Sequence, residues 1–407
     1  MAVTVTQTPF TYNPASNDQF FSASSNQTAQ PNFNFYITAT VFFNNGAAWT
    51  SQNYIERYAN GPDGFVRFNA RHLTESYIKH LFEYVGISNW RELVNSLIKV
   101  TINIGEEYGA TPVIYPGVNT TIYNWNASLT FLTMQSGGFI QNNYVCQNGS
   151  TFPLLNDLPD LKTTSLSVNL INLLSFTDNV ITKATITSTD GVSTATFDIA
   201  NPFFASGNWY DAYIRLNVGP AYLAAIGGVN WIGIPGTTYT VDFYDNPVTV
   251  RRKRITLSYT DVCSRYDKYQ MIYLNSKGAF DWFIFEMIST SDTRITRTNV
   301  RHQPYSDPTL AGIWSYDSLG RTDFTLSTSY QDSIKLNSDW MTAAQLLKLK
   351  DLVTSPVVYL QDLTTGLVYA VNNKDTVYIK KRKFNDKLLN LEINVAFANL
   401  EFRQRGI

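Results

Sequence analysis

Histidine is scarce in this chain of 407 residues, which contains only His72, His80 and His302. His72 and His80 are eight positions apart in a region with helical periodicity. Two histidines on one helix bind the same metal ion when they are four positions apart, and eight positions exceed that reach. We therefore interpret the three histidines as surface or half-buried side chains, and we expect neither a metal site nor a cofactor.

Close carboxylates are the other candidates for chemistry, because general acid and base catalysis needs paired groups. Glu106 and Glu107 are adjacent, and Asp157 and Asp160 are three positions apart. Neighbouring residues on a strand point to opposite faces, so we expect solvated charges rather than a catalytic pair. The sequence contains no nucleophile elbow, phosphate loop, dinucleotide fingerprint or calcium loop. The prediction is that the protein is not an enzyme.

Two basic clusters could neutralise phosphate: residues 251–254 (Arg-Arg-Lys-Arg) and 380–383 (Lys-Lys-Arg-Lys), the second flanked by Tyr378 and Phe384. A basic tetrad within a strand divides its charges between two faces, and the formal net charge is −1. We therefore predict a solvated or interfacial role, with Arg251 and Arg252 as candidate interface residues. Nucleic acid is expected only in transient contact with passing DNA.

Composition favours a β-rich protein with large contact surfaces. Charged residues make up 15% of the chain, against about 25% in ordinary globular proteins, while aromatic residues reach 14%.

Cys146 and Cys263 are far apart and are interpreted as free thiols in a reducing cell. The first residues lack the features of a signal peptide, and no apolar run is long enough to span a bilayer. We expect synthesis in the cytoplasm and no membrane partner.

The pattern of strands and turns predicts a mostly β protein with several sandwich-like or barrel-like domains and a few short helices. Pauses in the pattern divide the chain into residues 1–160, 161–254 and 255–407. Apolar spacing predicts helices within residues 70–99, where Leu73, Tyr77 and Leu81 form one stripe and Trp90 begins another. Residues 1–30 are either an extended arm that orders on a partner or a loop with an edge strand.

The C-terminal region carries the clearest element signals. Thr342 and Gln345 have the spacing of a capping box, and Pro356 limits a helix over residues 343–353. Alternation then predicts a strand over residues 389–398. Its buried face is expected to contain Leu389, Leu391, Ile393, Val395 and Phe397. The opposite face contains Asn390, Glu392, Asn394, Ala396 and Ala398. We predict that this face meets a neighbouring subunit or a lumen, with Asn390, Glu392 and Asn394 as candidate interface residues.

Residues 271–285 predict a hairpin that is aromatic on both faces. A strand with two apolar faces is either sandwiched between layers or lies at a subunit interface. Trp282 is therefore a further candidate interface residue.

Stretches near both ends of the chain resemble one protein family. They are Gln30 to Tyr36, Asp63 to Phe68, Leu336 to Thr342, Leu346 to Leu352, Ser355 to Leu360 and Leu391 to Arg405. In these stretches the chain is similar to tail structural proteins of phages that infect Bacteroidetes, including the crAss-like group. The resemblance touches both ends of the chain, and the named stretches total 48 residues. It implies a component of the tail or its hub, assembled as a ring, and it carries over no catalytic residue.

The residues and the resemblance together predict a structural, non-enzymatic virion protein: a ring-like tail hub or adaptor, hexameric or dodecameric, that contacts other phage tail proteins. One alternative is a module that binds host-surface glycan, with Trp209, Trp231 and Trp314 as stacking platforms. Tyr210 and Trp282 are further candidates for that role. A third hypothesis is a glycan-degrading enzyme, for which the sequence offers no confident acid and base pair.

Overall fold

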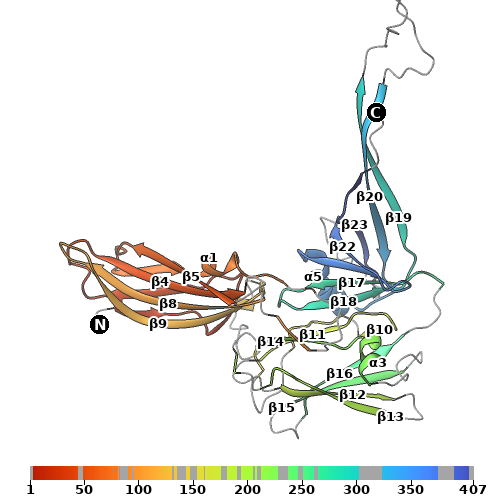
Figure 1. Cartoon of the computed structure of the whole chain (residues 1–407), viewed down its shortest axis with the longest axis horizontal. Helices are drawn as coiled ribbons and strands as arrows, with labels where there is room; N and C mark the ends of the chain where they lie inside the picture. Colours follow the sequence, from red (N-terminus) through yellow and green to blue (C-terminus); the bar gives the residue numbers. More distant parts are fainter. Residues whose placement is uncertain are drawn as a thin grey trace, which may run out of the picture. The chain divides into compact units, whose positions relative to one another are not determined.

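The computed structural model describes residues 3–402 except 45–48, 81, 83–89, 94–95, 131–132, 135–143, 147–153, 160, 176–180, 190–193, 205–206, 209–211, 228–236, 246–250, 261–264, 302–322 and 375–388. Two compact units are present (Figure 1). Unit 1 contains Met1–Cys263 and Tyr273–Trp282, and unit 2 contains Ser264–Ile272 and Phe283–Ile407. The described residues form open sheets with short helices, so the prediction of a mostly β, multi-domain sandwich-like protein is confirmed.

Unit 1 begins with two facing sheets. One has the order β1-β3-β6 (Val3–Gln7, Phe20–Ser25, Phe65–Asn69). The other has the order β2-β9-β8-β4-β5 (Tyr12–Pro14, Val113–Trp125, Leu97–Tyr108, Asn34–Asn44, Trp49–Tyr58).

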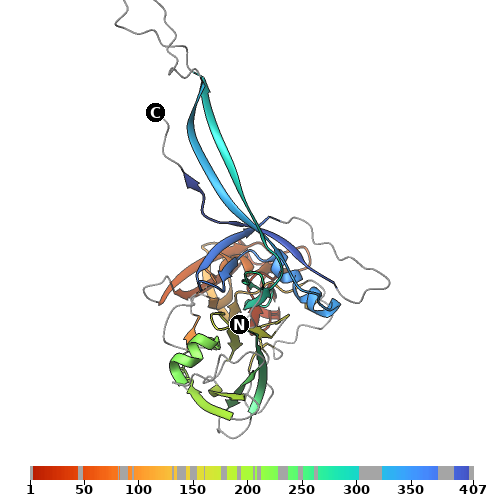
Figure 2. The same cartoon turned by 90° about the vertical axis from the view of Figure 1, so that its right-hand side faces the viewer.

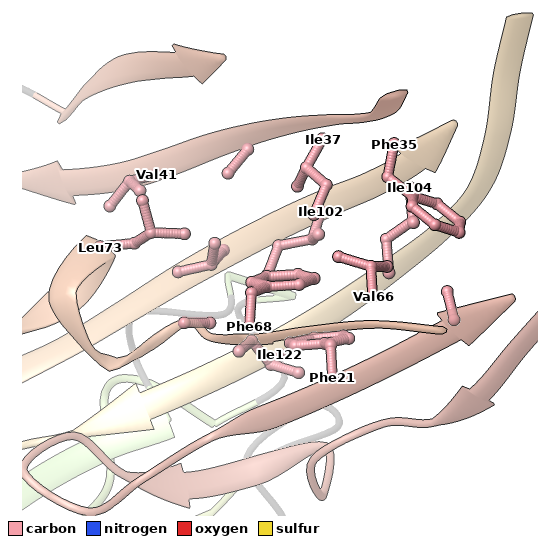
Figure 3. Close-up of a cluster of buried hydrophobic side chains, with 14 of the residues drawn as sticks. Phe21, Phe35, Ile37, Val41, Val66, Phe68, Leu73, Ile102, Ile104 and Ile122 are labelled. Carbon is pink, nitrogen blue, oxygen red and sulfur yellow. The ribbon is translucent and has the colours of Figure 1, made fainter. Parts of the chain in front are cut away.

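Alternating apolar residues of these two sheets form the core between them. Figure 3 shows Phe21 and Phe68 from the smaller sheet among Ile37, Ile102 and Ile122 from the larger one. The rings of Phe21 and Phe68 are stacked, with centroids 5.0 Å apart. The strand alternation seen in the sequence therefore places one face of each sheet in a shared core.

Two further sheets complete unit 1. The larger has the order β10-β16-β15-β12-β13 (Lys162–Thr163, Arg251–Tyr259, Thr238–Asp245, Ile181–Thr189, Thr194–Ala200). The smaller has the order β11-β14-β7 (Leu170–Leu174, Tyr213–Asn217, Trp90–Glu92), and helix α3 (Pro220–Gly227) follows β14. The rings of Trp90 and Phe243 meet edge to face across the two sheets, with centroids 6.3 Å apart.

Unit 2 is built on one long sheet with the order β18-β17-β21-β22-β23-β20-β19 and with β24 beside β20. Its strands are Phe280–Phe285, Tyr269–Leu274, Val358–Asp362, Val368–Asn373, Glu392–Phe397, Asp323–Asn337, Thr290–Arg301 and Glu401–Phe402. The turn end of the β17–β18 hairpin, Tyr273–Trp282, is part of unit 1.

The capped helix of the C-terminal region is present as predicted. Thr342 accepts a hydrogen bond from the Gln345 backbone N–H, and Gln345 Oε1 accepts one from the Thr342 N–H. The helix consists of two segments that meet at Leu349, α4 (Ala343–Lys348) and α5 (Lys350–Thr354). Leu346, Leu349 and Leu352 are buried, as the apolar stripe requires.

The prediction of helices at residues 70–99 is largely wrong for the described part of that region, which excludes residues 81, 83–89 and 94–95. Helix α1 (Arg71–Glu75) has five residues, and Trp90–Glu92 is strand β7, paired with β14. Leu97 is the first residue of strand β8. Apolar residues three and four apart are compatible with either state over short stretches, and here pairing with distant strands decides the outcome.

The two readings of residues 1–30 are also resolved. Strands β1, β2 and β3 are paired within unit 1, so this segment is part of the sheets and not an arm that orders only on a partner.

The predicted division of the chain into three domains at residues 160 and 254 stays a prediction. Strand β7 comes from the first predicted domain but pairs with β14 from the second.

Candidate interaction surfaces

The most exposed element is the ribbon, which we define as strand β19 together with residues 323–332 of β20, the part of β20 that pairs with residues 293–301. Strands β19 and β20 run together beyond the other strands of their sheet (Figures 1 and 2). All twelve residues of β19 are exposed. Threonine, isoleucine and valine favour an extended backbone, but the run has no apolar face to bury. The sequence therefore specifies a strand that contributes no face to a core.

Strand β19 is an edge strand, because β20 is its only partner within the described part of the sheet. Its pairing with β20 places Thr293 opposite Asp332, Ile295 opposite Tyr330 and Arg297 opposite Thr328. Thr293, Ile295 and Arg297 therefore share one face, since alternate residues of a strand point the same way. We call this the first face of the ribbon.

The ribbon contains three arginines, Arg294, Arg297 and Arg301, and three aspartates, Asp292, Asp323 and Asp332, so its formal net charge is zero. Arg297 and Arg301 lie on the first face and Arg294 on the other, and all three side chains are exposed. Within the described residues none of them forms an ion pair or ring contact. Arg301 lies opposite Asp323, whereas the partners of Arg294 and Arg297 are the neutral Gln331 and Thr328.

A pocket of about 660 Å³ lies at the base of the ribbon in unit 2. We call it the acidic pocket, because four carboxylates are among its lining residues: Asp292, Asp332, Asp362 and Glu401. Tyr269, Tyr330 and Tyr369 contribute aromatic rings to the same wall. Such a lining can bind a cation both by charge and through ring faces.

Neutral groups supply the hydrogen bonds to these carboxylates. The Thr293 hydroxyl donates to Asp332 at 2.6 Å, the Ser333 hydroxyl to Asp292 at 2.6 Å, and the Tyr330 hydroxyl to Glu401. The Thr365 hydroxyl donates to Asp362 at 2.8 Å. No lysine or arginine of the described chain pairs with these four side chains. Burial, together with the charges of Asp267 and Asp362, raises the pKa of Tyr269.

The predicted interface arginines are paired within their own sheet. Arg252 Nε donates to Asp245 at 2.7 Å, and Arg251 Nε lies 3.9 Å from Asp242. Arg254 holds Asp242 with two hydrogen bonds of 2.7 and 2.6 Å. Asp242 and Asp245 are almost fully buried, so these pairs balance charge in the sheet. Strand pairing thus accounts for three of the four cluster residues.

Trp282 does not lie on the surface. Its side chain is 1% exposed, and its indole N–H donates to the Lys162 carbonyl at 3.2 Å. Every residue of β18 is buried within this chain. This agrees with the interpretation that the aromatic hairpin is sandwiched between layers, and not with the interpretation that it lies at a subunit interface. Trp282 is therefore corrected from an interface or stacking residue to a core residue.

The predicted outer face of β23 is mixed. Asn390 and Glu392 are exposed, and Glu392 pairs with Lys335 at 2.7 Å. Asn394 is half-buried, and Ala396 is 3% exposed, which removes it from the surface. Leu391, Ile393 and Val395 are buried as predicted, whereas Leu389 and Phe397 are only half-buried.

Several predicted residues lie outside the described residues: Trp209, Tyr210, Trp231, Trp314, His302, Cys263, Asp160 and the basic cluster 380–383.

Cys146 is a buried, reduced thiol, and burial raises its pKa. His72 is exposed, with its ring nitrogens 2.7 Å from the Asn69 carbonyl and 2.8 Å from Glu56 Oε1. In the described part of the chain no group of three or more metal-binding side chains is present.

Glu106 and Glu107 are buried, which corrects the expectation that they are solvated. Glu106 accepts a hydrogen bond from the Ser25 hydroxyl at 2.6 Å, and Glu107 pairs with Arg57 at 2.6 Å. The two carboxylates thus have separate partners, as opposite faces of a strand require.

A second pocket, of about 470 Å³, lies beside Glu106 in unit 1. The rings of Tyr108 and Tyr115 stack there with centroids 4.6 Å apart, and Asn26 and Gln27 line the same pocket. Stacked rings beside amide and carboxylate groups form a surface on which a sugar ring can stack and donate hydrogen bonds.

A buried polar cluster around Asp281 in unit 1 was not predicted from the sequence. The side-chain amides of Asn156 and Asn275 donate to its carboxylate at 2.9 and 2.8 Å, and the Asp157 backbone N–H donates at 3.1 Å. Burial raises the Asp281 pKa to about 7, against the opposing effect of these donors. The available signal was a single aspartate in an otherwise apolar strand.

Comparison with known proteins identifies no family for this chain: neither protein-family models nor curated proteins give a match. Among the described helices, none has the length and apolar character that a membrane span needs.

Proposed function

We propose that this chain is a structural, non-enzymatic protein of a phage tail, which assembles as a homo-oligomeric ring and connects other tail proteins as a hub or adaptor. It would be assembled in the host cytoplasm and reside in the virion. The resemblance of both ends of the chain to tail structural proteins supports this proposal. A hexamer or a dodecamer is the expected ring.

The exposed ribbon is the observation that carries the proposal. A two-stranded ribbon without a packed face is marginally stable in water. A long edge strand also presents unpaired backbone groups to any neighbouring chain. Twelve exposed residues of β19 are therefore better accounted for as a contact surface than as part of the fold of one isolated chain.

Electron microscopy of the purified full-length protein tests the proposal, with mass photometry at micromolar concentration as a second readout. Rings of uniform diameter and a mass that is a fixed multiple of 46.0 kDa are expected. A strict monomer that also recovers no other virion protein in a pull-down would overturn it.

A host-glycan-binding module is the second candidate, and the pocket beside Glu106 is the observation that favours it. Tyr115 is 40% exposed and lines that pocket with Tyr108. Under this alternative a glycan array shows specific binding, which Tyr115→Ala abolishes without changing the thermal melting curve. Exposed Ile55→Ala, on a different strand, is the control and leaves binding intact. Absence of binding on the array would remove this alternative.

A further inference from the structure

Arg297 and the acidic pocket have opposite charges within the same unit. Arg297 and Arg301 are exposed on the first face of the ribbon, whereas Asp332, Asp362 and Glu401 line the pocket at its base. Neither set is neutralised by an ion pair among the described residues. Unpaired charges of opposite sign on one chain provide the complementarity that association between two copies requires.

Within one copy, Arg297 forms no ion pair with the carboxylates of the pocket among the described residues. Thr293, which hydrogen-bonds Asp332 in the pocket, is on the same face as Arg297 but four residues away along β19. Four residues of extended strand span about 13 Å. The Arg297 backbone is therefore displaced by that distance along the ribbon from the pair of Thr293 and Asp332.

We infer that the ribbon of one copy docks on a second copy of this chain, with Arg297 seated in the acidic pocket. This inference rests on the proposed assembly and names the contact that drives it. A guanidinium forms paired hydrogen bonds with a carboxylate, and it stacks on aromatic rings. The pocket offers both kinds of partner, Asp332 and Glu401 among the carboxylates and Tyr369 among the rings.

Apolar residues beside Arg297 suit the same occupant. Ile295 is 49% exposed on the first face, two positions from Arg297. A protein surface can bury such a side chain, whereas a free cation or a sugar leaves it in water. Arg297 lies outside the pocket lining, and a head-to-tail contact between Arg297 of one copy and the pocket of the next closes into a ring when the rotation allows.

A simpler role for the arginines is protection of the edge strand, because charged side chains discourage strand pairing between molecules. The two roles predict different results for charge reversal. A protective charge can be replaced by an acidic one without loss of assembly. A docking arginine cannot be replaced in this way. Assembly is then recovered only when the charge of its partner residue is also reversed.

The test is a charge-swap series in the full-length protein: Arg297→Asp, Asp332→Arg, and the double variant. Both positions are exposed, so far-ultraviolet circular dichroism and the thermal midpoint are expected to stay unchanged. We expect each single variant to raise the apparent dissociation constant of the oligomer at least tenfold by mass photometry. The double variant is expected to recover assembly. Thr296→Glu, on the opposite face of β19, is the control and should assemble like the natural chain.

The outcomes separate this inference from the proposed function. If the natural chain forms rings and Arg297→Asp assembles equally well, the docking contact is refuted while the proposed assembly stands. Loss of assembly in both single variants without recovery in the double variant also refutes the pairing of Arg297 with the acidic pocket. A monomeric natural chain refutes the proposed assembly itself, and the docking contact with it.

Discussion

Two hairpins of this chain, β17–β18 and β19–β20, follow one another in sequence and have opposite environments. Every residue of β18 is buried, whereas every residue of β19 is exposed. β18 has five apolar residues out of six, and β19 has two out of twelve. The same backbone geometry therefore serves a core in one hairpin and an outward surface in the other, and side-chain composition decides between them.

Trp282→Ala should give the largest effect in this comparison. The Trp282 side chain is 1% exposed, and its truncation removes a large apolar contact area and leaves a cavity. We expect a loss of about 3–5 kcal/mol in the free energy of unfolding, measured by urea denaturation. A loss below about 1 kcal/mol would show that the β17–β18 hairpin is not packed as described.

The pH dependence of stability should report on Asp281 in the same hairpin. Burial raises its folded-state pKa to about 7, above the ordinary value of 3.8. A raised pKa means that the folded state binds the proton more tightly, so the contribution to stability is full below about pH 4 and is lost as the pH rises through 7. Between pH 5 and pH 8 the free energy of unfolding should fall by about 2 kcal/mol.

Asp281→Asn is the control for that pH dependence. The amide cannot titrate, so the fall between pH 5 and pH 8 should flatten, although the variant is less stable because its NH₂ group faces buried donors. An unchanged pH profile in this variant would assign the dependence to other groups.

Gly278→Ala tests how tightly the turn of the buried hairpin is held. Gly278 has a φ of 90°, and an added Cβ would lie 2.1 Å from the Asn126 carbonyl oxygen. Strain and the clash together should lower the free energy of unfolding by about 1–3 kcal/mol in urea titrations. Gly64→Ala is the matched control, since Gly64 also has a positive φ but has open space around its Cβ position. Equal losses in the free energy of unfolding of the two variants would show that the clash with the Asn126 carbonyl oxygen does not contribute.

Ile295→Ala should give the smallest effect. Ile295 lies on the exposed ribbon, and surface substitutions of this kind change the free energy of unfolding by less than about 0.5 kcal/mol. The same substitution at Ile284, 3% exposed in β18, should cost about 2–5 kcal/mol. Similar urea midpoints for the two variants would contradict the contrast between the hairpins.

Local signals in the sequence predicted local structure well. The capping box at Thr342 and the alternation around Ile393 gave the helix and the buried face of β23, because neighbouring residues determine both. The region around Trp90 was predicted wrongly as helix, because its partner strand β14 lies more than a hundred residues away in sequence. Pairing of that kind leaves no trace in the spacing of apolar residues.

The candidate surfaces depended even more on distant contacts. Arg252 was predicted as an interface residue, but strand pairing places Asp245 beside it. The ribbon has no periodic apolar face, so its sequence resembles a loop until its register with β20 is known. The acidic pocket combines side chains from several strands, and no single stretch of sequence contains it.

The central claim is that this chain assembles through its exposed surfaces, and the mass of the purified full-length protein tests it most directly. Mass photometry at micromolar concentration should give one dominant species at a fixed multiple of 46.0 kDa, in agreement with rings seen by electron microscopy. A single species at 46.0 kDa, unchanged across the accessible concentration range, would contradict the claim.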